Sequence, residues 1–364
     1  MAIFSKIFKS FLPSRAYLGV DIGTASIKIS ELGEKDGRVA LQNYGILEAY
    51  GHLIRVNSAI QTSGLKVMEK ETAELAKKLL REMKPKARDA VASIPTFAAF
   101  TALIDVPAMS AAELNQAIGY QARALVPLPA ADVSLDWMKV GSYEDEKGIK
   151  KEEILLISIP NEQIERYRQI FRLSGLNLVS VEMEGMSLAR LLTLNDPATS
   201  LIIDIGARST AILVAENGFL KYAGQTDFAG NSLTQTLAAG LGINVQRAEM
   251  LKRQKGLLGT GGEYSLSTLM ATHLDVILSE VKRVKNIYEK NYRGKPEKAI
   301  LSGGGANLLG IEKYAADWLG LPVVKADPFS RIAIAPELYP LAPDIGAPLS
   351  VSLGLSIKEF LHSP

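Results

Sequence analysis

The sequence contains no cysteine and only three histidines in 364 residues. Without cysteine, the chain has no disulfides and no thiolate ligands for a metal. The histidines stand at positions 52, 273 and 362, and no two of them have the spacing of zinc ligands. We therefore expect neither a disulfide-stabilised fold nor a zinc centre.

An excess of charge of one sign and a long apolar run are also missing. The 41 Lys and Arg residues are balanced by 39 Asp and Glu residues, so no global basic field favours binding of nucleic acid. No apolar run approaches the roughly 20 residues of a membrane-spanning helix. With 47% hydrophobic and 22% charged residues, the composition is typical of a folded soluble protein, and the length predicts two or three domains.

The first twelve residues carry apolar side chains at helical spacing, with lysines and serines between them, and Pro13 ends the pattern. The segment lacks the cleavage site of a signal peptide. Two interpretations stay open. Residues 1–12 either pack on the body of the protein, or form a short basic amphipathic element that docks on a partner or makes peripheral contact with a membrane.

Two similar turns are the most informative feature that is present. Asp21-Ile-Gly23 and Asp204-Ile-Gly206 each follow an apolar strand and lead into a second strand. Either turn alone is compatible with a simple hairpin. The strand order around the first turn repeats around the second, which indicates a duplicated α/β architecture. Glycine turns with successive amides form anion nests, so the pair predicts a phosphate clamp with both aspartates holding Mg²⁺ through water and Lys28 reaching the phosphates.

A third glycine turn, Gly303-Gly304-Gly305, follows a strand at 298–301 and precedes a helix that we expect to begin at Asn307. A backbone without side chains can approach a flat ring or a phosphate closely. The turn lacks the Gly-x-Gly-x-x-Gly spacing and the lysine of a Walker loop, so neither a Rossmann nor a P-loop site is indicated.

Residues 96–175 form a block of their own with the pattern β-α-β-β-α. A capping box, Ser110 to Glu113, opens its first helix, and Gly175 is the expected C-terminal cap of its second. The size of about 80 residues is that of a plausible subdomain.

These motifs together resemble the actin-like ATPase superfamily: two Asp-Ile-Gly hairpins, the Gly-Gly-Gly turn and a closing Pro343-Asp-Ile-Gly-Ala segment, in that order. The insert stands where the FtsA-like proteins carry subdomain 1C, and its Gln121-Ala-Arg-Ala-Leu-Val-Pro-Leu-Pro129 segment is similar to the PilM family of type IV pilus assembly. The resemblance implies a duplicated actin-like α/β fold of the FtsA type, with two lobes around a nucleotide cleft and a 1C-type insert.

The expected domain boundaries follow from this resemblance. They are residues 1–14 for an amphipathic segment, 15–95 with 176–199 and 340–364 for the first lobe (1A), 96–175 for the insert, and 200–339 for the second lobe (2A and 2B).

Carried over residue by residue, the resemblance implies ATP and Mg²⁺ as cofactors. The amides from Gly23 to Ser26 would face the inner phosphates, and those from Gly206 to Ser209 the terminal phosphate. Glu249 and Lys252 would lie near the ribose, and Glu280 and Arg283 would flank the adenine; a solvated helix face is the alternative for these four. Glu184 is the candidate catalytic residue that positions the attacking water, with Glu182 beside it, although acids here also cap helices. The predicted cofactor-binding residues are Asp21, Gly23, Thr24, Ala25, Ser26, Lys28, Asp204, Gly206, Ala207, Arg208, Ser209, Gly230, Glu249, Lys252, Glu280, Arg283, Gly303, Gly304, Gly305 and Asn307.

The resemblance also implies a role. The chain would be a scaffold at the cytoplasmic face of the inner membrane that recruits the cytoplasmic tail of PilN, in the groove between first lobe and insert. Other platform proteins, assembly ATPases and further copies of the chain are additional expected partners. Nucleotide would set the angle between the lobes, with slow or no hydrolysis.

Two other functions compete with this role. An FtsA-like polymerising, membrane-associated cytoskeletal ATPase is the main alternative, although FtsA carries a C-terminal amphipathic helix that this sequence does not show. A small-molecule kinase needs a base beside an acceptor hydroxyl, and the sequence offers no such constellation.

Overall fold

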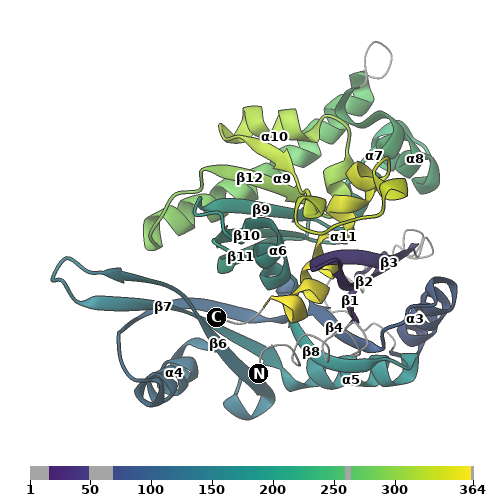
Figure 1. Ribbon diagram of the computed structural model, residues 1–364. Coiled ribbons are helices and arrows are strands. Elements are labelled where there is room, and N and C mark those ends of the chain that lie inside the picture. The colour runs from purple at the N-terminus through teal and green to yellow at the C-terminus, as the bar shows by residue number, and fades with distance from the viewer. Residues whose placement is uncertain (1–15, 49–68, 259–263, 362–364) are drawn as a thin grey trace.

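Two five-stranded sheets with the same strand order form the centre of the molecule (Figure 1). The computed structural model describes residues 16–48, 69–258 and 264–361. Each sheet begins with a three-stranded antiparallel meander, whose first strand then pairs in parallel with a fourth and the fourth with a fifth. The predicted duplication is confirmed.

The first sheet, in the order β3-β2-β1-β4-β8, contains β1 (Ala16–Ile22), β2 (Ser26–Lys35), β3 (Arg38–Glu48), β4 (Asp89–Ile94) and β8 (Asn177–Met183). The second, in the order β11-β10-β9-β12-β13, contains β9 (Ser200–Ile205), β10 (Thr210–Glu216), β11 (Phe219–Thr226), β12 (Lys298–Ser302) and β13 (Val323–Lys325).

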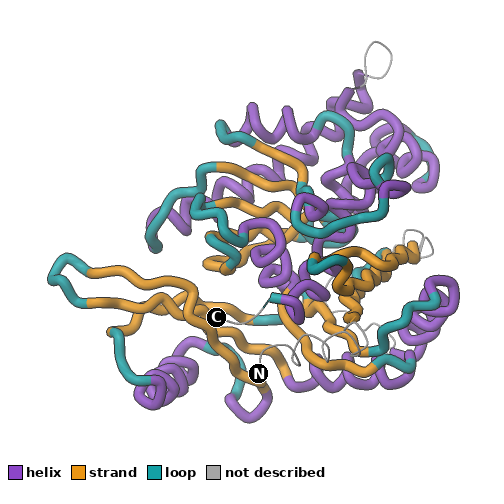
Figure 2. The backbone as a smooth tube through the Cα atoms, in the orientation of Figure 1, coloured by secondary structure: helices purple, strands orange, loops and turns teal. Residues whose placement is uncertain are grey.

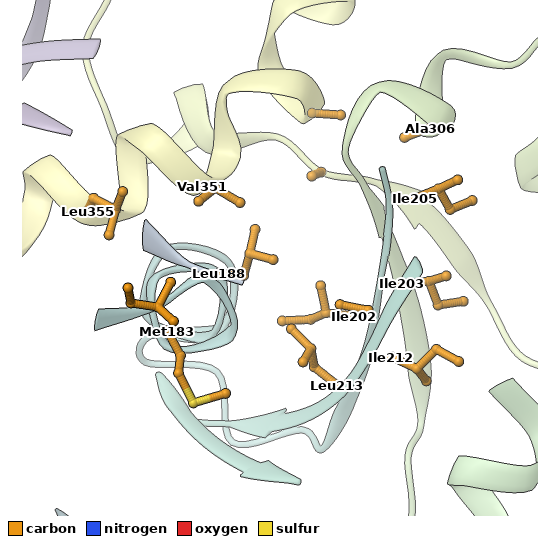
Figure 3. Close-up of a cluster of buried hydrophobic side chains, with 14 of the residues drawn as sticks. Met183, Leu188, Ile202, Ile203, Ile205, Ile212, Leu213, Ala306, Val351 and Leu355 are labelled. Atoms are coloured by element: carbon orange, nitrogen blue, oxygen red, sulfur yellow. The ribbon is translucent and has the colours of Figure 1, made fainter. Parts of the chain in front are cut away.

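Two helices, α6 (Glu184–Thr193) and α11 (Ala342–Ile357), lie between the sheets and connect the lobes. Small residues let them approach closely. A Cβ on Gly19 of β1 would lie 1.8 Å from the Ser352 carbonyl oxygen of α11, and one on Gly354 would lie 2.3 Å from the Ser187 carbonyl oxygen of α6. Figure 3 shows side chains of α6 and α11, among them Leu188 and Val351, packing toward the apolar strands of the second sheet. The base of the cleft between the lobes is therefore a continuous packed core.

The outer helices cover the far faces of the sheets, as the helical and strand segments of Figure 2 show. On the first lobe, α3 carries its buried residues on one face and packs against β3 and α5. On the second lobe, α9 packs on β10 and β11 and contacts α7. The helices on the sheet faces are α3 (Glu69–Met83), α9 (Tyr264–Asn291) and α10 (Ile311–Leu319), while α7 (Gly230–Leu241) and α8 (Val245–Lys255) pack against each other and α7 also packs against α9.

The insert forms a separate three-stranded antiparallel sheet in the order β5-β7-β6. Ile154 and Leu156 of its central strand pack toward α4, while Leu155 and Ile157 join the core of the lobes, as the two-residue period of a strand requires. The predicted capping box at Ser110 is present. The elements are β5 (Phe100–Pro107), α4 (Ala111–Leu125), β6 (Val133–Glu144), β7 (Lys150–Pro160) and α5 (Asn161–Ser174). Helix α5 ends at Gly175, whose φ of 75° is left-handed as predicted, and packs on α3 and β8.

The structure differs from the sequence prediction after the third glycine turn. No α-helix begins at Asn307, because Gly304–Asn307 form a short 3-10 turn (η6) and α10 starts only at Ile311, after the left-handed Gly310. The short η2 turn (Thr96–Ala98) likewise precedes β5. The predicted amphipathic segment at residues 1–12 lies outside the described residues. Among the helices in the described ranges, none has the length and apolar character needed to cross a bilayer.

Candidate functional site

A cavity of about 540 Å³ lies where the two lobes meet, lined by residues from both. The three predicted glycine turns all contribute to its wall, although they come from β1–β2, β9–β10 and the segment after β12. The predicted residues in its lining are Ala25, Ser26, Lys28, Gly206, Ala207, Gly230, Glu249, Lys252, Gly304, Gly305 and Asn307. Tertiary structure thus brings together segments that are more than 250 residues apart in the chain.

The first two turns are closed in the same way. The Gly23 amide donates to the Ser26 carbonyl at 2.9 Å, and the Gly206 amide donates to the Ser209 carbonyl at 3.0 Å. Neither glycine has a positive φ. A Cβ would instead lie 3.1 Å from the Ser26 carbonyl oxygen or 2.8 Å from the Ser209 carbonyl oxygen. Because the two glycine amides close the turns, phosphate would be held by the amides that follow them, not by Gly23 and Gly206 themselves.

Asp21 is fully engaged by protein groups. Its Oδ1 accepts from the Ser93 hydroxyl at 2.9 Å, and its Oδ2 lies 3.2 Å from the Lys28 ammonium. Burial by itself would lower the pKa of Lys28, but the carboxylates of Asp21, Asp204 and Glu184 raise it above its ordinary value. Lys28 is therefore a fixed positive charge that lines the cavity.

Asp204 has the opposite environment. Within the described residues, its Oδ1 is buried without a hydrogen-bond partner. Gly303, with a φ of 77°, passes so close that a Cβ there would lie 2.9 Å from this oxygen. Burial raises the pKa of the Asp204 carboxyl above its ordinary value, and Lys28 opposes the shift. An acceptor-only oxygen without a donor fits a cation or its water. Magnesium thus fits Asp204 better than Asp21, and no cluster of three acidic, histidine or cysteine residues occurs among the described residues.

Glu184 stands at the first residue of α6 and accepts hydrogen bonds from the Thr96 amide and hydroxyl, both at 2.9 Å. Burial and the neighbouring Asp204 raise its pKa to about 8. The raised pKa favours the protonated form of this carboxyl. The neighbouring Glu182 is a structural residue, because it forms a two-pronged ion pair with Arg190 at 2.6 and 2.7 Å.

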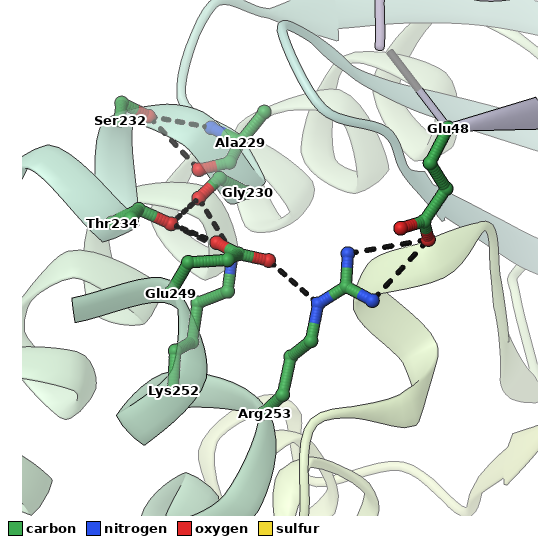
Figure 4. Close-up of polar contacts among 8 residues, drawn as sticks. All are labelled: Glu48, Ala229, Gly230, Ser232, Thr234, Glu249, Lys252 and Arg253. Carbon is green, nitrogen blue, oxygen red and sulfur yellow. Dashed lines mark hydrogen bonds and ion pairs between the residues drawn. The ribbon is translucent and has the colours of Figure 1, made fainter. Parts of the chain in front are cut away.

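A polar network connects α7 and α8 on the second lobe (Figure 4). The Lys252 ammonium lies 2.6 Å from Glu249 and donates to the Thr234 hydroxyl at 2.8 Å and the Gly230 carbonyl at 3.0 Å. Although burial opposes it, Lys252 and the hydrogen bonds lower the pKa of Glu249 below its ordinary value. Burial lowers the pKa of Lys252 below its ordinary value, although Glu249 opposes the shift. The two residues predicted for the ribose therefore lie together in the cavity wall as an ion pair.

Sequence reasoning missed an ion pair that joins the lobes. Arg253 of α8 donates to Glu249 at 2.8 Å and, across the cavity, to Glu48 at the end of β3 at 3.2 and 3.3 Å (Figure 4). Both Glu48 and Arg253 line the cavity. Nothing in the local pattern distinguishes them from other charged surface residues, since only the fold makes them neighbours.

The sequence also did not indicate the apolar part of the wall, to which Leu274 and Ile277 of α9 contribute. The predicted adenine residues Glu280 and Arg283 are not in the lining and pair with each other at 2.7 Å on the same helix. The other apolar lining residues near the third glycine turn are Leu308, Leu309 and Ile311. The predicted residues Asp21, Gly23, Thr24, Asp204, Arg208, Ser209 and Gly303 belong to the three turns but not to the lining.

Comparison with known proteins identifies the family. The model of the type IV pilus assembly protein PilM family matches residues 19–360. The chain belongs to the PilM family. The resemblance inferred from its motifs is thereby confirmed.

Solved structures agree with a PilM-type actin-like fold. The structure titled PilM-PilN type IV pilus biogenesis complex has a TM-score of 0.78 and 22% identity, covering 95% of this chain and 99% of that one. An MreB protein of Spiroplasma citri bound to AMPPNP has a TM-score of 0.53 and 14% identity, covering 96% and 97%. The cell division protein FtsA of Bacillus subtilis (strain 168) is 26% identical over 148 residues, 35% of this chain and 33% of FtsA, so the match spans about a third of that relative. The predicted actin-like architecture is confirmed.

Proposed function

We propose that this PilM-family chain is an ATP-binding scaffold that recruits the cytoplasmic tail of PilN to the pilus assembly platform, at the cytoplasmic face of the inner membrane. Nucleotide binding in the cavity would set the angle between the lobes and so control partner binding. The observation that carries the proposal is the convergence of three glycine turns from both lobes on one cavity of about 540 Å³.

The cavity has the chemistry of a nucleotide site. Lys28 provides a positive charge between the two hairpin turns, where the amides following Gly23 and Gly206 would hold the phosphates. The ionised Glu249 accepts hydrogen bonds, which suits ribose hydroxyls, and the apolar side chains of Leu274 and Ile277 suit a flat base. A solved MreB relative of the same fold is bound to AMPPNP, which supports this use of the fold.

Magnesium would be held mainly by Asp204 through water, since its Oδ1 needs a partner. When bound, the ion would neutralise charge on the phosphates. Glu184, the candidate for positioning the attacking water, accepts hydrogen bonds from the Thr96 amide and hydroxyl and lies outside the cavity lining. This favours a nucleotide clamp with at most slow hydrolysis.

PilN is the proposed partner because a solved complex that matches this chain over 95% of its length pairs a PilM with a PilN. The groove between the first lobe and the insert remains our proposed binding place. Other platform proteins, assembly ATPases and self-association stay predictions, as do the domain boundaries and a membrane contact through residues 1–12.

Calorimetric titration tests the two halves of this function separately. ATP should bind in the presence of Mg²⁺ and much more weakly in excess EDTA. A synthetic peptide with the PilN cytoplasmic tail sequence should bind with an affinity that changes when the protein is saturated with Mg-ATP. Absence of ATP binding would refute the clamp, and absence of peptide binding in both conditions would refute the recruitment.

A further inference from the structure

The insert is attached to the second lobe, although its chain leaves and re-enters the first lobe. Strand β11, at the edge of the second sheet, contacts β5 and β6 of the insert. Lys221 of β11 extends toward the insert, and its ammonium lies 2.6 Å from Glu153 Oε2 on β7. The two side chains are only 5% and 12% exposed. In Figure 1 the long β6–β7 hairpin runs beneath β10 and β11.

A glycine in a strand bulge makes room for this ion pair. Gly141 pairs with Glu153 in the β6–β7 register, which shifts between Lys139 and Gly141. A Cβ on Gly141 would lie 2.1 Å from Glu153 Oε2 and 2.7 Å from the Lys221 ammonium. Any other residue at position 141 would therefore occupy the space of the ion pair. We call this arrangement of Gly141 and Glu153 the lysine socket.

A second contact lies toward the tip of the same hairpin. The Arg293 guanidinium, after α9, stands 3.7 Å from the centre of the Tyr143 ring on β6. The Tyr143 hydroxyl donates to Asp105 of β5 at 2.8 Å, and this hydrogen bond holds the ring in place within the insert. On the second lobe, Tyr222, Tyr288 and Tyr292 form a packed aromatic group next to Lys221 in the chain and Arg293 after α9.

The start of the insert is connected to the cleft as well. Thr96, its first residue, donates both its amide and its hydroxyl to Glu184 at 2.9 Å. Glu184 begins α6 and lies close enough to Asp204 for the neighbouring carboxyl to raise its proton affinity. The sheet of the insert is thus held at its root by the connecting helix and along its hairpin by the second lobe, while helix α5 of the insert packs on α3 and β8 of the first lobe.

We propose that Lys221 in the lysine socket makes the three-stranded sheet of the insert, with α4, move with the second lobe. A change in the angle between the lobes would then shift the insert relative to the first lobe, and would widen or narrow the groove between them. The coupling rests on the proposed function in one respect, since nucleotide is the agent that changes the angle. Breaking a buried ion pair from one side leaves an uncompensated charge, so the contact resists separation.

Distance measurements between spin labels test the proposal directly, because the natural chain has no cysteine to replace. Cysteines are introduced in pairs at three exposed positions: Glu82 of α3 for the first lobe, Tyr120 of α4 for the insert and Val324 of β13 for the second lobe. Each pair is measured without nucleotide and with Mg-AMPPNP, after calorimetry has established whether nucleotide binds.

The test variant is Lys221→Met combined with Glu153→Gln, which removes both charges and keeps the side-chain lengths. Its matched control is Lys139→Met with Glu152→Gln, an ion pair of 2.5 Å that joins the same two strands inside the insert and does not reach the second lobe. Melting temperature verifies that both double variants are folded.

We expect nucleotide to shift the Glu82–Val324 and Glu82–Tyr120 distances together and to leave the Tyr120–Val324 distance unchanged. In the test variant the Tyr120–Val324 distribution should broaden and the insert should no longer follow the second lobe, whereas the control should behave like the parent. A constant Glu82–Tyr120 distance beside a shifted Glu82–Val324 distance would overturn the proposal, and so would a test variant that matches the control. If calorimetry detects nucleotide binding but the Glu82–Val324 distance stays constant, nucleotide does not change the angle between the lobes, and an unbroadened Tyr120–Val324 distribution in the test variant refutes the coupling. If no nucleotide binds, the proposed nucleotide clamp fails, and the same Tyr120–Val324 distribution still decides the coupling.

Discussion

The two Asp-Ile-Gly turns have the same backbone and different electrostatics. Both sit between the first two strands of a sheet with the same order, and both close with a glycine amide donating to a serine carbonyl. Asp21 is satisfied by Ser93 and Lys28, whereas Asp204 keeps a buried oxygen that has no partner among the described residues. Duplication therefore accounts for the scaffold, and the side chains that surround each turn decide its chemical role. The first turn carries its own cation, whereas the second leaves one buried carboxylate oxygen without a partner among the described residues.

The largest expected effect is on ATP affinity, and it comes from placing a side chain in the cavity whose wall both turns help to form. Gly304 lines the cavity, and a Cβ there would meet no atom within 4 Å. Gly304→Val should leave the melting temperature nearly unchanged and weaken ATP binding by about 100-fold, because the side chain occupies the ligand's volume. Fluorescence titration with a labelled ATP analogue measures this. Gly119→Val, an equally open glycine on the insert, is the control, and undiminished affinity in Gly304→Val would place the ligand elsewhere.

Replacing each aspartate in turn separates the two environments. Asp204→Asn should weaken Mg-ATP binding by about 10-fold and remove the difference between Mg²⁺ and EDTA, because the ion loses its charged partner. Asp21→Asn should keep that difference but lower stability by about 1–3 kcal/mol, because Lys28 loses its charged partner. Calorimetry and chemical denaturation distinguish the variants. Equal Mg²⁺ dependence in both would show that the turns are equivalent.

The pH dependence of stability tests the environment of the Glu184 carboxyl at the start of α6. Because the pKa of Glu184 is raised from 4.5 to about 8, the folded protein keeps a proton that the unfolded chain loses between these values. Its contribution to the free energy of unfolding should therefore fall as pH rises through this window and level off above pH 8. Glu184→Gln should flatten this dependence, measured by urea denaturation, and the exposed Glu165→Gln should not. Identical profiles for parent and Glu184→Gln would mean that another group is responsible.

The smallest effect is expected at the ion pair between the lobes. Arg253 is about half exposed, so its bond to Glu48 should contribute only about 0.2–1 kcal/mol and should weaken with salt. A double-mutant cycle of Glu48→Gln and Arg253→Gln on stability measures it. The same variants should release nucleotide up to about 5-fold faster in stopped flow, because the pair spans the cavity. A coupling energy of zero at low salt would show that the Glu48–Arg253 ion pair does not stabilise the contact between the lobes.

Local patterns were sufficient for most elements of the fold. The meander after each turn, the capping box at Ser110 and the end of α5 at Gly175 all follow from neighbouring residues, and each is present in the structure. The helix start after the third glycine turn was misplaced, since the left-handed Gly310 that precedes α10 resembles other glycines in the sequence.

The candidate site was predicted only where backbone chemistry leaves a local signature. Glycine turns are such signatures, and so are acids at strand ends. Arg253, Glu48 and the apolar wall of Leu274 and Ile277 were not found, because ion pairs and pockets between distant elements have no sequence period. Conversely, Glu280 and Arg283 have the expected residue types on the expected helix, but they lie outside the lining and pair with each other.

The sequence by itself determined the duplicated strand order, the three glycine turns and the insert, because strand period, turn residues and helix caps act within a few residues. Only the tertiary structure decided which aspartate is neutralised by a lysine, which carboxyls have a raised pKa, and where the insert is attached. These properties depend on burial and on charges from distant segments. The Lys221–Glu153 pair, 68 residues apart in the chain, exists only because the two sheets and the insert pack against one another.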